Sequence, residues 1–126
     1  MTYEIVKEKF PERTNFIPHA LPDNLFYPME DNDIKHAKQK MLGYDKKDNF
    51  VLFWVNRNAK RKRPSDVLAA WKKFLDKLTP HQKNKTTLLM HTDPHDQEGP
   101  NLLAVSDMLG ITNSVIFSNE RVDFEV

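Results

Sequence analysis

The feature that most constrains this chain is an uninterrupted apolar run that leads into a basic loop and then into an amphipathic pattern. The run is Phe50–Val55, and residues 56–63 hold five Lys or Arg side chains. A strand that is buried on both faces, as in a parallel sheet, needs such a run. Pro64 suits the first turn of a helix because it lacks an N–H that would need a partner. The segment therefore predicts a strand–loop–helix unit whose strand is buried on both faces.

The rest of the chain repeats this alternation of strand and helix signals. Apolar runs at residues 86–90 and 114–117 predict two more strands, and a further short strand is expected at 15–18. Helices are expected over Thr2–Lys9, from Asp31 or Asn32 to Leu42, over 64–78, and over 101–109. Strands that alternate with helices imply parallel pairing. The predicted fold class is α/β, a Rossmann-like three-layer half-domain with a parallel sheet.

The helix expected over residues 64–78 carries an apolar stripe that should pack on this sheet. The stripe comprises Val67, Leu68, Trp71, Phe74, Leu75 and Leu78.

Two cations in the loop after Phe50–Val55 form the strongest candidate site. In open α/β sheets, ligands bind beyond the carboxyl ends of the strands, and helix amino termini favour anions. Arg57 can grip a phosphate with two hydrogen bonds, and Lys62 adds a point charge. A solvated basic loop is the plain alternative, and the run from Lys60 to Arg63 also resembles a nucleic-acid patch. Balanced charge, 19 basic against 18 acidic residues, argues against nucleic acid.

A second cluster follows the next predicted strand. His91, Asp93, His95 and Asp96 are residue types that bind metals. Because the Asp93-Pro94 pair breaks any helix there, a helical i, i+4 histidine pair is excluded. We therefore favour a ligand-facing loop, with His91 and Thr92 as candidates, and expect no metal.

Composition places the chain among soluble globular domains. With 126 residues it is one domain at most, and its lack of cysteine excludes disulfides. It begins with no signal-peptide core and contains no apolar stretch long enough to span a membrane. The expected location is cytoplasmic.

The order of these motifs resembles the donor-binding domain of GT-B fold, family-4-type retaining glycosyltransferases. Arg57, Lys62 and Ala70-Trp71 match that family's strand, Arg, Lys and helix spacing. Residues 16–22 with Phe26 and Pro28 resemble its interdomain crossover. Residues 88–93 and 109–117 match the next two strands. The resemblance spans about residues 13–120, and it divides the chain into a crossover segment, 1–28, and a partial nucleotide-sugar-binding domain, 29–126.

This resemblance implies a role in hexosyl transfer from a nucleotide sugar. Arg57 and Lys62 would bind the donor diphosphate without a metal or other cofactor, and Phe117, Ser118 and Asn119 would lie near the nucleotide base. His19 stands where the family usually has Asn. The family's pair of catalytic glutamates and its acceptor domain are not identifiable here, so no catalytic residue is assigned and the isolated chain is expected to be inactive.

Two alternatives stay open at this point. One is a non-catalytic nucleotide- or phosphate-binding module. The other is a structural α/β domain whose open sheet edges pair with a second copy or with companion domains.

Overall fold

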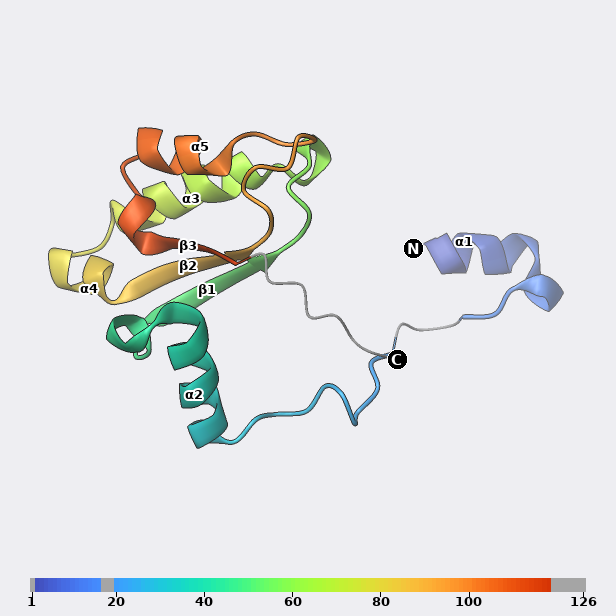
Figure 1. Cartoon of the computed structure of the whole chain (residues 1–126). Coiled ribbons are helices and arrows are strands. Elements are labelled where there is room, and N and C mark those ends of the chain that lie inside the picture. The colour runs from blue at the N-terminus through green and yellow to red at the C-terminus, as the bar shows by residue number, and fades with distance from the viewer. Residues whose placement is uncertain (1, 17–19, 119–126) are drawn as a thin grey trace. The chain divides into compact units, whose positions relative to one another are not determined.

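The computed structural model describes residues 2–16 and 20–118 (Figure 1). The chain divides into two compact units, Met1–Glu30 and Asp31–Val126, each of which is described by itself. Among the helices of the described ranges, none has the length and apolar character that crossing a bilayer requires.

The first unit is helical at its start. Helix α1 (Thr2–Lys9) forms as predicted, and the 3-10 turn η1 (Pro11–Arg13) follows it. No residue of α1 is buried, and the Tyr3 ring lies 5.3 Å from the Phe16 ring. The predicted strand at 15–18 is wrong for Asn15 and Phe16, which have no strand partner, while residues 17–18 lie outside the described ranges.

The second unit contains one parallel sheet. Its strands β1 (Phe50–Val55), β2 (Thr86–His91) and β3 (Val115–Ser118) lie in the order β1-β2-β3. Both pairings are parallel, with Leu52 beside Leu88 and Leu88 beside Val115. The predicted α/β class and parallel pairing are therefore confirmed. The other elements are α2 (Asp31–Leu42), η2 (Tyr44–Lys46), η3 (Lys60–Lys62), α3 (Pro64–Leu75), α4 (Pro80–Asn84), α5 (Leu102–Met108) and η4 (Thr112–Ser114).

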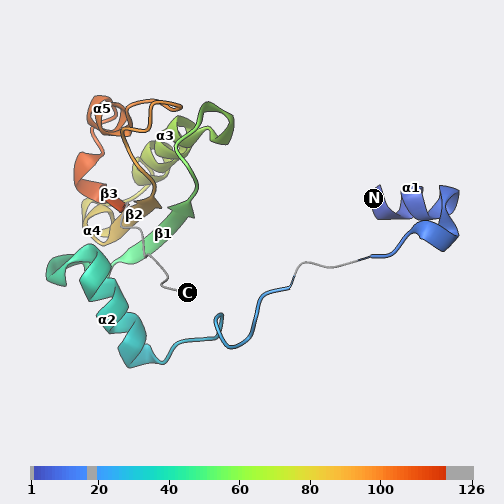
Figure 2. The same ribbon diagram turned by 45° about the vertical axis from the view of Figure 1, so that its right-hand side comes forward.

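Helices lie on both sides of the sheet, but they cover it unequally. In Figures 1 and 2, α3 and α5 share one side, and α2 lies on the other side beside the start of β1. The core forms on the α3–α5 side. Its buried members are Leu68, Trp71, Leu75, Leu88, Met90, Leu102, Ile111 and Val115.

The apolar stripe on α3 packs into this core largely as predicted. Leu68, Trp71 and Leu75 are buried, and Val67 is partly buried against them, whereas Phe74 stays 38% exposed. The helix ends at Leu75 rather than at residue 78. A new helix, α4, begins directly afterwards with a capping box between Thr79 and Gln82. Because Thr79 precedes a proline, its backbone is held extended and α3 cannot continue through it.

Strand β1 contradicts the prediction that it is buried on both faces. Four of its six residues are exposed. The exposed fractions are 59% for Phe50, 44% for Leu52, 54% for Phe53 and 54% for Val55. The reason is incomplete cover, since α3 and α5 lie on one side of the sheet and α2 lies only beside the start of β1 (Figures 1 and 2). The strand buried on both faces is β2, whose residues from Thr86 to Met90 are all buried.

Candidate functional site

The carboxyl ends of β1 and β2 bring two polar loops together. Val55 lies beside His91 in the sheet register, so the loop after β1 and the loop after β2 leave the same edge. The first loop carries Arg57 and leads into η3 and α3, and the second runs from Thr92 to the start of α5. The two polar loops therefore begin side by side at one edge of the sheet.

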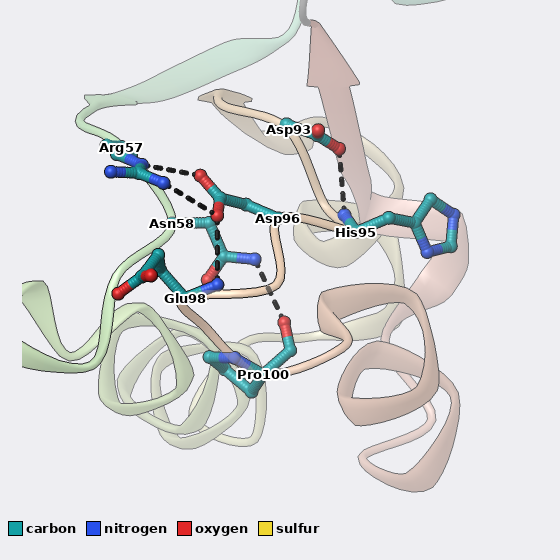
Figure 3. Close-up of polar contacts among 7 residues, drawn as sticks. All are labelled: Arg57, Asn58, Asp93, His95, Asp96, Glu98 and Pro100. Carbon is teal, nitrogen blue, oxygen red and sulfur yellow. Dashed lines mark hydrogen bonds and ion pairs between the residues drawn. The ribbon is translucent and has the colours of Figure 1, made fainter.

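Arg57 is held by a carboxylate from the second loop (Figure 3). Its Nε and Nη2 donate to Asp96 at 2.7 Å (Oδ2) and 3.1 Å (Oδ1). Asp96 Oδ1 also accepts the backbone N–H of Glu98 at 3.0 Å. These two contacts hold the pKa of Asp96 below its usual value, with the Arg57 bond as the larger cause. Asp96 in turn raises the pKa of Arg57, so both groups are charged at neutral pH.

A second contact locks the loops together beneath this pair. Asn58 is 1% exposed, and its Nδ2 donates to the Pro100 carbonyl at 2.9 Å. The Lys60 N–H donates to the Glu98 carbonyl at 3.1 Å. A Cβ at Gly99 would lie 2.0 Å from Asn58 Oδ1, so only glycine fits there. The path of the first loop is therefore fixed by the second.

A surface hollow of about 370 Å³ opens at this edge. Its lining residues are Val55, Asn56, Arg57, His91, Thr92, Asp93 and Asp96. Thr92 is 5% exposed, and its Oγ1 has no hydrogen-bond partner among the described residues. A buried hydroxyl without a partner costs about 1–3 kcal/mol. Thr92 thus places a buried polar atom, unsatisfied within the described residues, at the edge where the hollow lies.

Further cations surround the same loops. A neighbouring hollow is lined by Arg57, Ala59, Lys60, Arg61, Gln97 and Glu98. At the start of α3, a third hollow is lined by Lys60, Arg63, Pro64, Ser65, Asp66, Gly99 and Pro100. No side chain caps α3, because its N-cap residue Arg63 makes no such bond. The positive end of the helix dipole therefore adds to these cations.

The predicted site residues divide into those that meet and those that do not. Arg57, His91 and Thr92 line one hollow, and Ser118 joins them through its Oγ, 3.3 Å from His91 Nδ1. Lys62 lies on η3 and lines neither hollow that contains Arg57.

The remaining predicted residues lie away from the Arg57 hollow or outside the described chain. Phe117 packs against the core. Asn119 and His19 lie outside the described residues.

The acidic residues and histidines of the second loop take separate roles. Asp93 Oδ1 accepts the His95 backbone N–H at 2.9 Å, and the His95 ring is turned away from Arg57 (Figure 3). Within residues 2–16 and 20–118, no group of three or more His, Asp or Glu side chains could hold a metal ion.

Sequence reasoning missed Asn58 as a structural contact and Asp96 as the partner of Arg57. The available signal was the placement of opposite charges just after two neighbouring strands.

Comparison with known proteins adds no family to this description, because no family model, curated protein or solved structure matches the chain.

Proposed function

We propose that this chain binds the diphosphate of a nucleotide sugar as part of a glycosyltransferase-related, GT-B-like donor domain. The observation that carries the proposal is the hollow that Arg57 and Thr92 line together at the carboxyl edge of the sheet. A guanidinium beside the carboxyl edge of a parallel sheet suits phosphate oxygens.

In this proposal the chain's contribution to sugar transfer is electrostatic. As the bond between sugar and diphosphate breaks, negative charge builds up on the departing diphosphate. Arg57 and Lys62, with the positive end of α3, would stabilise that charge, which is the usual role of such donors in a transition state. No residue of the chain is assigned as the catalytic group that acts on the sugar.

The test is a calorimetric titration of the full chain with UDP, GDP and ADP. We expect weak binding of a nucleoside diphosphate by the wild type. The double variant Arg57→Ala/Lys62→Ala should lose about 1–3 kcal/mol of binding free energy, the scale of charge-assisted hydrogen bonds. The matched control is Lys73→Ala/Lys77→Ala, which removes the same charge from exposed positions at the end of α3 and just beyond it.

Two results would contradict the proposal. If both double variants bind as tightly as the wild type, the ligand does not lie at Arg57 and Lys62. If the wild type binds none of the three nucleotides, the chain does not recognise a diphosphate, and the second candidate function below takes precedence.

The second candidate function is a structural domain that assembles through β1. The observation in its favour is that β1 is an edge strand with exposed apolar side chains and no charged residue or proline. Natural edge strands usually carry a charged residue or a proline, which prevents pairing with another strand.

A further inference from the structure

The guanidinium of Arg57 already makes the pair of hydrogen bonds that it would make to a phosphate. Asp96 takes its Nε and Nη2 with two oxygens at 2.7 and 3.1 Å. This forked geometry is the one in which arginine also grips phosphate. An anion that binds Arg57 through the same two nitrogens must therefore first separate it from Asp96.

The pair is placed so that separation is physically accessible. The Arg57 side chain is 65% exposed, whereas that of Asp96 is 15% exposed. Exposed ion pairs contribute only about 0–1 kcal/mol, so a multiply charged ligand can replace one. Asp96 Oδ1 accepts both Arg57 Nη2 and the Glu98 N–H, and after separation it would keep the bond to Glu98.

The charges next to the pair favour one class of ligand. Lys60 and Arg61 line the hollow adjoining Arg57. A single phosphate on Arg57 merely exchanges one anion for another. A diphosphate can place one phosphate on Arg57 and the other toward Lys60 and Arg61, and it thereby gains a contact that the carboxylate does not have.

We propose that Asp96 is an internal competitor for Arg57. The Asp96 carboxylate occupies the anion site in the unliganded protein, and it is displaced when a diphosphate binds. Asp96 is thus a specificity-determining residue rather than a ligand contact. The inference rests on the proposed function, because it concerns the same site.

The experiment uses the full chain and inorganic pyrophosphate as the probe. Asp96→Asn keeps the shape of the side chain and its acceptor for the Glu98 N–H, but it removes the competing charge. Affinity for pyrophosphate should rise about three- to tenfold. Two effects contribute: the ligand no longer has to break the exposed Arg57–Asp96 ion pair, and the carboxylate no longer repels it. Asp96→Glu, which retains the carboxylate, should bind like the wild type.

The matched control is Asp76→Asn. It removes the same charge from the exposed ion pair with Lys72, whose Nζ donates to both Asp76 oxygens, and it lies outside the three hollows. Its affinity for pyrophosphate should equal that of the wild type. A gain as large as that of Asp96→Asn would show a net-charge effect and would overturn the competitor role.

The outcomes separate this inference from the proposed function. If the wild type binds pyrophosphate and Asp96→Asn binds it no more tightly, the competitor role is wrong and the proposed function stands. If neither protein binds pyrophosphate, and the wild type binds no nucleoside diphosphate, both are wrong. Binding by Asp96→Asn alone would support the competitor role.

Discussion

At the scale of single residues, two buried oxygens are left without partners at the same edge of the sheet. Asn58 Oδ1 and Thr92 Oγ1 both lack a hydrogen bond among the described residues. The two residues that carry these oxygens have different roles in the structure. The Asn58 amide stands over Gly99 and holds the two loops in place through its other atom. Thr92 lines the hollow with Arg57, while its own hydroxyl oxygen is buried.

The Arg57–Asp96 pair gives a prediction about proton binding. Because Arg57 is the main cause of the lowered pKa of Asp96, Arg57→Gln should raise that pKa toward the ordinary value of about 3.9. The measurement is an NMR titration of the side-chain carboxyl carbons. Asp76, whose pKa is lowered chiefly by Lys72, should titrate alike in both proteins and serves as the internal control.

The same shift fixes the direction of a stability change with pH. A carboxyl with a lowered pKa in the folded state stabilises that state above its unfolded pKa, and the stabilisation is lost as pH falls through the folded pKa. The wild type should therefore lose more stability below about pH 4 than Arg57→Gln does. An identical titration of Asp96 in both proteins would contradict the pairing.

Sequence reasoning reached Arg57 but not its partner, for a physical reason. The position of Arg57 follows from the strand before it, which is a local pattern. The pair with Asp96 joins residues 39 apart, and it depends on the register that sets Val55 beside His91. Periodicity within one element does not specify that register.

At the scale of elements, α3 shows how one helix anchors the sheet. Trp71 is 2% exposed, and its Nε1 donates to Ser114 Oγ at 2.9 Å, just before β3 begins. Phe74 lies against it, with ring centroids 5.1 Å apart, but on the outer side of the helix. The two aromatic residues therefore share a helix and differ in burial.

This difference predicts unequal costs of truncation. Trp71→Ala should destabilise the fold by about 3–5 kcal/mol, the range for large buried aromatics. Phe74→Ala, the matched control on the same helix, should cost much less because the ring is already 38% exposed. Denaturant unfolding of both variants measures the two values. A Trp71→Ala cost below about 1 kcal/mol would contradict the packing of the stripe.

The elements that the sequence predicted correctly are those with a local signal. The stripe on α3 has a helical periodicity, and the runs in β2 and β3 are short and apolar. The burial of β1 was predicted wrongly. An apolar run shows that a strand has side chains suited to burial, but it does not specify which elements pack over them. Leu78 fits the stripe, but Thr79 and Pro80 impose a stop that periodicity does not register.

At the scale of the whole molecule, the three-stranded sheet has one free edge rich in apolar side chains. The Phe50 N–H donates toward β2, to the Lys85 carbonyl. Because backbone groups alternate along a strand, Val51, Phe53 and Val55 direct theirs to the free edge. The parallel fold class and the presence of open sheet edges followed from the order of motifs, whereas the position of β1 at an edge followed only from the strand order.

The free edge gives a prediction about assembly. If β1 pairs with a second copy, the wild type should show concentration-dependent self-association in analytical ultracentrifugation. Phe53→Lys should weaken it at least tenfold, because a charge on an edge strand opposes pairing. Met108→Lys, at an exposed apolar position on α5, is the control and should not change it. A wild type that sediments as a monomer at every concentration would contradict this assembly.

The long separation between the two loops has a consequence during synthesis. The loop with Arg57 is made 39 residues before Asp96. At about 5–20 residues per second, that interval lasts roughly 2–8 s. For this time Arg57 lacks the carboxylate that pairs with it in the finished protein. The completed protein pairs Arg57 with its own carboxylate, so the order of synthesis alone leaves this cation without that partner until Asp96 has been made.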